Sequence, residues 1–131
     1  MTRRKAVLAA CGVILGVVAT AAAPEILWDP MHRQTALTFK RAVSLPGVTL
    51  GPGTYVFEVA NPESGSNVVR VRAKEDYRQV YYAGFTNMVE RPENLGDWPV
   101  LLGEAIPGKA VPILAWYPQG DRMGRQFIYP R

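Results

Sequence analysis

Proline and glycine turns recur along this chain between short runs of alternating apolar residues, and their spacing constrains the fold more than any other feature. After residue 35 the turn signals come at intervals close to the roughly 8–12 residues typical of β-sandwiches and barrels. No stretch after that point keeps the 3.6-residue period of an amphipathic helix. The sequence therefore predicts an all-β domain, a small antiparallel β-sandwich or partly open barrel of about seven strands. The expected strands cover residues 36–43, 54–59, 68–73, 79–88, 100–105, 111–117 and 126–129.

The clearest strand signal is the run Thr54–Val59, which follows a Gly-Pro-Gly turn. Side chains alternate in a strand, so its aromatic residues face one way and Glu58 faces the other. The next expected strand carries Arg70 and Arg72 on one face, and the two strands are a hairpin candidate. We expect Glu58 to pair with these arginines across the strands. The alternative is a basic stripe formed by the two arginines and Lys74.

Thirteen aromatic residues, comprising three Trp, six Tyr and four Phe, lie in or beside the expected strands. Neighbouring side chains of an extended strand point to opposite faces, so the pairs 81–82 and 116–117 should each place one ring outward. Exposed Tyr and Trp rings can stack on sugars or anchor a protein partner. The expected core aromatics are Phe39, Tyr55, Phe57, Trp116 and Phe127. The candidate binding residues, on outward positions or in the longer loops, are Tyr82, Trp98, Tyr117, Asp121 and Arg122.

The first 21 residues have the pattern of a secretory signal peptide. Three basic residues at positions 3–5 precede the uncharged stretch 6–24, and small residues around Ala21 offer A-x-A cleavage sites. Cleavage after Ala21 would remove three of the 15 basic residues and leave 12 against 11 acidic ones, a net charge of +1. A charge this small lacks the electrostatic footprint of a nucleic-acid-binding protein. Two alternatives stay open: an uncleaved membrane anchor, and lipidation at Cys11.

These features divide the chain into a signal segment or anchor, 1–21, a lead-in segment, 22–35, and a β-sandwich domain, 36–131. The signal segment would be helical if it were retained. We expect export to the periplasm or the extracellular space, with contact to the membrane only through an uncleaved or lipidated N-terminus.

Few side chains in this sequence suit catalysis or metal binding. Cys11 is the single cysteine, so a cleaved protein has no thiol nucleophile, redox pair or zinc-thiolate site. His32 is the single histidine, and a triad would need it beside a serine such as Ser44, which has no G-x-S-x-G setting. Asp29 and Met31 near that histidine fall short of the three or four ligands of a metal site. We therefore expect no catalytic residue, no metal and no cofactor.

Four segments carry a resemblance to a protein family: 43–57, 67–71, 115–121 and 124–130. In these segments the sequence resembles a family of small exported bacterial β-rich proteins with no assigned activity. The resemblance spans about residues 36–131, and its more specific pieces are the W-Y-P-x-G-D and Q-F-x-Y-P motifs near the C-terminus. It implies export and a β-rich domain, and it supplies no catalytic residues.

The sequence as a whole predicts a non-catalytic exported envelope protein that acts as a binding or structural module. Its partner would be an envelope protein or a cell-wall polysaccharide. One alternative is a dedicated polysaccharide-binding module. Another is a small carbohydrate-active or hydrolytic enzyme that uses loop carboxylates such as Asp97 and Asp121.

Overall fold

The computed structural model describes residues 25–26, 33–65 and 67–130, and this part of the chain is all-β, as the sequence predicts. Its helices are two single 3₁₀ turns, Pro62–Ser64 (η1) and Glu93–Leu95 (η2). No helix in these residues is long and apolar enough to span a membrane. The described residues form ten strands, more than the sequence indicates: β1 (Glu25–Ile26), β2 (Thr35–Phe39), β3 (Val43–Leu45), β4 (Val48–Leu50), β5 (Gly53–Val59), β6 (Val68–Ala73), β7 (Val80–Glu90), β8 (Val100–Leu102), β9 (Val111–Trp116) and β10 (Met123–Phe127).

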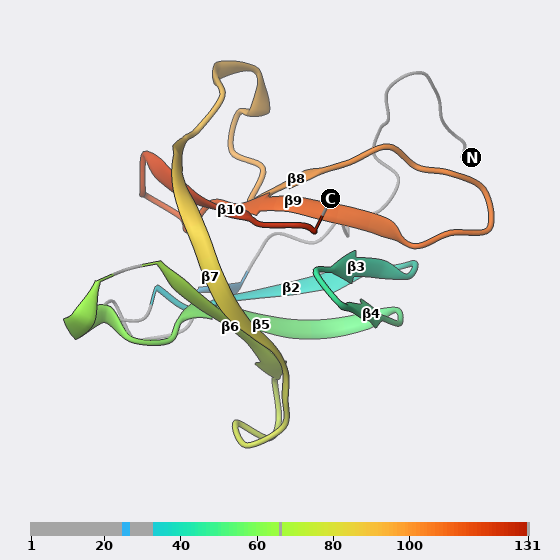
Figure 1. The fold of residues 1–131 in the computed structure, drawn as a ribbon, viewed down its shortest axis with the longest axis horizontal. Helices are drawn as coiled ribbons and strands as arrows, with labels where there is room; N and C mark the ends of the chain where they lie inside the picture. The colour runs from blue at the N-terminus through green and yellow to red at the C-terminus, as the bar shows by residue number, and fades with distance from the viewer. Residues whose placement is uncertain (1–24, 27–32, 66, 131) are drawn as a thin grey trace.

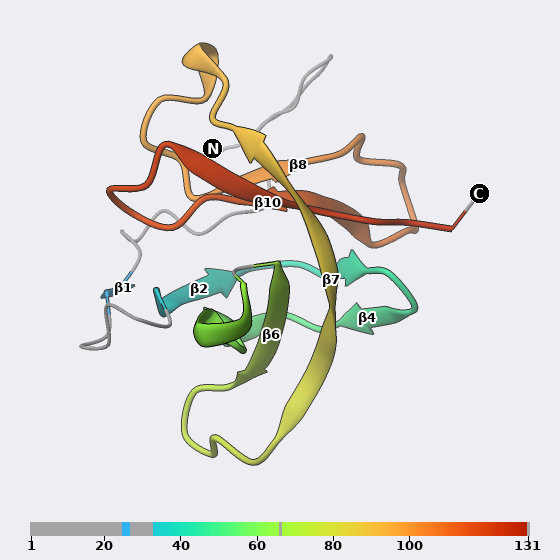
Figure 2. The same cartoon turned by 60° about the vertical axis from the view of Figure 1, so that its left-hand side comes forward.

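One long strand, β7, joins the two layers of the molecule. Its first half pairs with β6 and its second half pairs with β10. Figures 1 and 2 show β7 crossing from the layer that holds β2, β5 and β6 to the layer that holds β8, β9 and β10. The strand order is β1-β2-β5-β6-β7-β10-β9-β3-β4, with β8 paired to β9 off this path, so the sheet of the described residues stays open.

The sheet is mixed, because one strand pair departs from the antiparallel arrangement that the sequence predicts. Strand β3 runs parallel to β9, with Val43 opposite Val111. The Tyr129 hydroxyl lies 2.9 Å from the carbonyl oxygen of Ser44 and 2.7 Å from that of Ile113, so it bridges the two parallel strands. Burial raises the pKa of this hydroxyl to about 12, against the lowering effect of its two hydrogen bonds. Parallel strands come from distant parts of a chain, so the spacing of turns gives no signal of such a pair.

Several strand boundaries also differ from the prediction. The expected strand 36–43 ends at Phe39 and resumes as β3 at Val43. The last strand begins at Met123 rather than at residue 126. The lead-in segment contributes β1, which pairs with β2. Its last residues, 33–35, lead into and begin β2, whereas residues 22–24 and 27–32 of that segment and the signal segment 1–21 lie outside the described residues.

The β5–β6 hairpin forms as predicted, with Glu58 paired to the arginines of β6, and supplies the centre of the core. Phe57 lies opposite Val71, and Glu58 lies opposite Arg70. Val56, on the same face as Glu58, is also fully buried, so β5 is covered on both faces. Of the expected core aromatics, Phe39, Phe57, Trp116 and Phe127 are buried, and Tyr55 packs against them at the edge.

Two β-bulges break the alternation on which the aromatic predictions depend. In β7, Tyr82 pairs with Val71 while Val80 pairs with Arg72, which leaves Tyr81 as the extra residue. As expected, one ring of this pair is exposed: Tyr81, at 39%, which contacts Tyr55 with ring centroids 5.4 Å apart. Tyr82 packs against the core and contacts Phe127 at 5.7 Å. The prediction that Tyr82 points outward is wrong.

The second bulge lies in β9. Leu101 pairs with Ala115 and Leu102 with Ile113, so Leu114 is the extra residue. Alternation restarts after the bulge, and Ile113 and Trp116, three positions apart, both reach the core. Of the 116–117 pair, Trp116 therefore packs in the main core.

Candidate functional site

A cleft of about 1020 Å³ opens between the loop that follows β7 and the turn that precedes β10. Polar and apolar groups share its walls about equally, and three buried residues, Thr35, Pro99 and Tyr117, contribute to the lining. The other lining residues are Glu90, Arg91, Pro92, Glu93, Gly96, Asp97, Gln119, Gly120, Asp121 and Arg122. Clefts with a few converging polar groups are the usual places where proteins bind small ligands.

Arg91 fixes both walls of this cleft. Its Nη1 donates hydrogen bonds to the carbonyl oxygens of Gly96 and Trp98, at 2.8 and 2.7 Å. Its backbone N–H donates to the carbonyl oxygen of Arg122 across the cleft, at 2.9 Å. Its guanidinium carbon lies 5.0 Å from the centre of the Tyr117 ring, a cation–π contact. One side chain thus holds the 92–98 loop against the turn that carries Tyr117.

The Tyr117 ring is only 2% exposed, so the expectation that it binds ligand with an exposed ring is wrong. Gly124 makes the space for this ring, because a Cβ at that position would lie 2.2 Å from Tyr117 Cδ2. Burial raises the pKa of the Tyr117 hydroxyl, and the nearby Arg91 partly offsets this. The sequence motif W-Y-P-x-G-D therefore supplies a buried floor for the cleft rather than an outward ring.

Asp121 is the centre of a charged group at the cleft. Its Oδ2 lies 3.2 Å from Arg125 Nη1 and 3.3 Å from Arg33 Nη1, and its Oδ1 accepts a hydrogen bond from the Met123 N–H. Arg125 is buried, which lowers its pKa, and the hydrogen bond and charge of Asp121 oppose that shift. An arginine remains charged at all ordinary pH values, so Asp121 neutralises a permanent buried cation.

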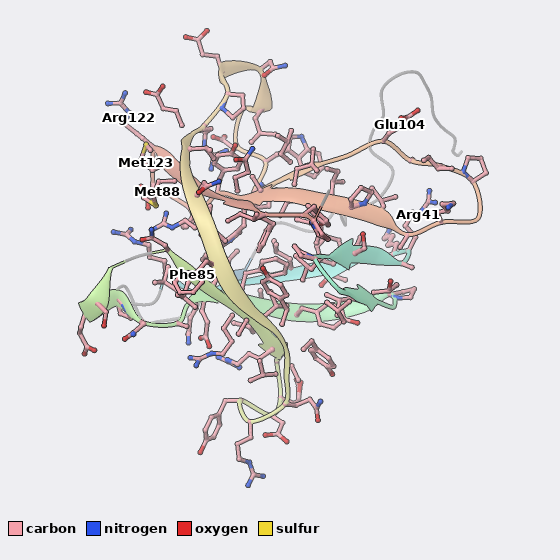
Figure 3. The ribbon with its side chains drawn as sticks, viewed as in Figure 1. Arg41, Phe85, Met88, Glu104, Arg122 and Met123 are labelled. Carbon is pink, nitrogen blue, oxygen red and sulfur yellow. The ribbon has the colours of Figure 1, made fainter. Side chains whose placement is uncertain are left out.

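The structure brings three of the five predicted binding residues to the cleft: Tyr117, Asp121 and Arg122. Trp98 is 48% exposed and lies between two lining residues, Asp97 and Pro99. The fifth, Tyr82, is partly buried against the core, and this burial raises its pKa. Figure 3 shows Arg122 at the end of the turn before β10, pointing away from the layers. Its side chain is 90% exposed and lies 3.7 Å from Glu90 Oε2.

Arg33, Arg91 and Arg125 are functional candidates that the sequence reasoning missed. Arg125 had a usable signal, because alternation backward from the core residue Phe127 places it on the inner face of its strand. Arg33 and Arg91 carry no such signal, since Arg33 contacts Asp121 and Arg91 contacts Tyr117, both far along the chain.

The carboxylates of the cleft do not make a metal site. Within the described ranges, no group of three or more His, Cys, Asp and Glu side chains is placed to hold a metal ion. The residues weighed for a metal or a nucleophile near the N-terminus, Cys11, Asp29, Met31 and His32, lie outside those ranges.

Comparison with known proteins gave no relative. No protein-family model, no curated protein and no solved structure matches this chain significantly.

Proposed function

We propose that this chain is a non-catalytic, exported binding module of a bacterial envelope and that its ligand occupies the cleft between the β7 and β10 loops. The observation that carries the proposal is the construction of the cleft. Arg91 and the Asp121 group hold both walls in place before any ligand arrives. A site that is already ordered loses little conformational entropy on binding.

Non-catalytic binding is favoured because two central polar groups of the cleft, Asp121 and Arg91, are committed to structure. Both oxygens of Asp121 accept hydrogen bonds from the protein itself. Arg91 Nη1 donates its hydrogen bonds to the backbone carbonyl oxygens of Gly96 and Trp98. A general acid or nucleophile needs a carboxylate that can reach the substrate, so Asp121 is poorly suited to either role.

Photo-crosslinking in cells tests the cleft as a binding site. A diazirine amino acid is placed at Gln119, an exposed lining residue, and at Tyr77, an exposed residue of the β6–β7 turn away from the cleft. The full chain is expressed in an export-competent host. We expect a defined adduct from position 119 and none from position 77. Equal adducts at both positions, or none at position 119, would count against the proposal.

Export is tested separately by the intact mass of the protein from soluble and membrane fractions. The signal pattern predicts a soluble species that lacks residues 1–21. Full-length protein in the membrane, or a species that begins at Cys11 with added lipid mass, would indicate a tethered module instead. A full-length chain that stays in the cytosol would contradict export.

One observation favours a hydrolytic enzyme as the second candidate: Asp97 and Asp121 line the same cleft. Release of reducing ends from a panel of glycans would reveal such an activity. Asp97→Asn should abolish it without lowering the melting temperature, because Asp97 is exposed. No release of reducing ends from any glycan in the panel would exclude this candidate.

A further inference from the structure

Strand β7 and the turn before it carry most of the exposed apolar side chains of this protein. Eight large hydrophobic residues are exposed in the described part of the chain, and five of them lie between positions 77 and 88. These five are Tyr77, Val80, Tyr81, Phe85 and Met88. Exposed apolar residues that gather in one region mark an interaction surface, whereas scattered ones are ordinary. The region around β7 is therefore a candidate contact surface.

Phe85 is at the centre of this region. It is 73% exposed although it lies in the middle of a strand rather than in a turn. Figure 3 shows it midway along β7. Tyr82 and Thr86 are on the core side of the strand, so alternation places Ala83, Phe85 and Asn87 on the other side. With two exposed or half-buried residues of the flanking strands they form what we call the Phe85 face: Val68, Ala83, Phe85, Asn87 and Gln126.

The Phe85 face carries no charge, and this property suits contact with an identical face. Residues 79–89 include no Asp, Glu, Lys or Arg. Two copies of a charged face would repel each other, whereas two copies of an uncharged face do not. The first charged residues beyond this stretch are Arg78 at one end and Glu90 at the other, with side chains 79% and 74% exposed. Two antiparallel copies of β7 would bring these opposite charges together.

We propose that the Phe85 face is the contact surface of a homodimer, in which β7 of one copy packs face to face and antiparallel against β7 of the other. The two Phe85 rings then meet at the two-fold axis, and Ala83 of each copy lies near Asn87 of the other. Buried aromatic rings at the centre of an interface are common anchors of binding. None of the five residues lines the cleft, so this proposal does not depend on the proposed function.

The size of the face determines the strength that we expect. A standard stable interface uses about 20–30 residues on each side, and the Phe85 face is much smaller. We therefore expect a reversible dimer that forms as the protein concentration rises. The exposed Phe85 ring contributes little to the stability of a single copy, because it is not removed from water when the chain folds. Its replacement should weaken the dimer and leave the folded monomer intact.

Sedimentation equilibrium of the chain recovered from an export-competent host tests the dimer. The weight-average mass should rise toward twice the monomer mass with increasing concentration. Phe85→Ser should raise the dissociation constant by about tenfold or more. Tyr77→Ser is the matched control, because Tyr77 is also 73% exposed but lies on the β6–β7 turn, and it should behave as the unaltered protein does. Urea denaturation of the dilute Phe85→Ser variant should give an unchanged free energy of unfolding.

A constant monomer mass over the whole concentration range would overturn the proposal. The same mass profile for Phe85→Ser and the unaltered protein would do so as well, since the contact would then lie elsewhere.

Crosslinking with Phe85 intact tests the antiparallel arrangement. Ala83→Cys and Asn87→Cys are made in two differently tagged full chains that also carry Cys11→Ser, so each chain has one thiol. A short bismaleimide can span the roughly 10 Å between two packed sheets. The mixture should give more crosslinked dimer between the two tags than either variant gives with itself. Adding Phe85→Ser to both chains should remove this product.

The control for crosslinking is Tyr77→Cys, which should give no dimer above the level of random collision. Equal yields from Tyr77→Cys and from the mixture would overturn the proposed contact. Crosslinking of position 83 or 87 to a different protein in cells, with no adduct between two copies, would assign the Phe85 face to another partner and overturn the homodimer.

Discussion

Two carboxylates of this protein each bind two arginines, but their structural roles differ. Glu58 on β5 is 1% exposed, and its Oε2 lies 2.5 Å from Arg70 Nε and 3.2 Å from Arg72 Nε, both on the neighbouring strand. Asp121 lies in a turn, its side chain is 18% exposed, and its arginines come from the start of β2 and from β10. The first group is part of the pairing of two strands, whereas the second joins separate parts of the chain beside a cleft.

Residues 33 and 34 connect the two groups. Arg33 binds Asp121, and the next residue, Gln34, donates from its Nε2 to Glu58 Oε1 at 2.6 Å. The segment that leads into β2 therefore contacts both carboxylate groups. Removing either carboxylate shows which group contributes more to the free energy of unfolding.

Removal of Glu58 should have the largest effect. Glu58→Ala leaves the buried Arg72 without its counter-charge and leaves the Gln34 amide without its acceptor. Breaking a buried ion pair from one side costs about 3–5 kcal/mol, so we expect a loss of that order in the free energy of unfolding. Urea denaturation measures it, with Glu63→Ala, an exposed residue of η1, as the control. A loss no larger than that of the control would show that the buried pair adds nothing.

The next effect concerns the floor of the cleft. Gly124→Ala places a methyl group within 2.2 Å of the Tyr117 ring and 2.9 Å of the Trp116 carbonyl oxygen. Overpacking of this kind typically costs about 1–3 kcal/mol, and we expect the upper part of that range. Gly51→Ala is the matched control, because a Cβ there meets nothing within 4 Å. Equal stability of the two variants would show that Tyr117 moves aside freely.

The Glu58 group could be predicted from sequence, and the Asp121 group could not. The alternation within Thr54–Val59 and within Val68–Ala73 places Glu58 and the two arginines on the same face of neighbouring strands, which is enough to predict that they pair. Asp121 could be recognised as a turn residue, but its partner Arg33 comes from the other end of the domain. Nothing local in a sequence encodes such a pairing.

The core aromatics were predicted correctly, but the outward positions of Tyr82 and Tyr117 were wrong for a related reason. They rest on strict alternation, which holds in β5 and β6, where Phe57 and Val71 face the core. In β9 a single extra residue restarts the alternation, and in β7 Tyr82 lies opposite the buried Val71, which makes it the ring of its pair that packs against the core. A bulge leaves no reliable mark in one sequence, since it depends on which strand the segment pairs with.

Asp121→Asn should lower the free energy of unfolding by less than Glu58→Ala does. The amide keeps an acceptor for the Met123 N–H but removes the negative charge beside the buried Arg125. Because the Asp121 side chain is partly exposed, water replaces some of the lost interaction, and we expect a loss of roughly 1–2 kcal/mol. The measurement is urea denaturation beside Glu58→Ala. A larger loss than in Glu58→Ala would reverse the ranking of the two groups.

The smallest effect concerns a neutral group, the Tyr129 hydroxyl, which joins β3 to β9 without any charge. Its pKa is raised to about 12 in the folded protein by burial, above the ordinary value of 10 for tyrosine. The folded state therefore favours the protonated hydroxyl. The stability that it contributes is fully present below pH 10 and is lost as the pH rises toward 12.

Tyr129→Phe should cost about 0.5–1.5 kcal/mol at neutral pH, the value of an ordinary hydrogen bond. It should also remove part of the alkaline loss of stability, because phenylalanine cannot ionise. The other tyrosines with raised pKa values, Tyr55, Tyr82 and Tyr117, remain in the variant, so the difference between the two pH profiles isolates Tyr129. Parallel profiles between pH 9 and 12 would mean that the hydroxyl ionises alike in the folded and unfolded chains. In that case the parallel strands would be held by backbone pairing and packing alone.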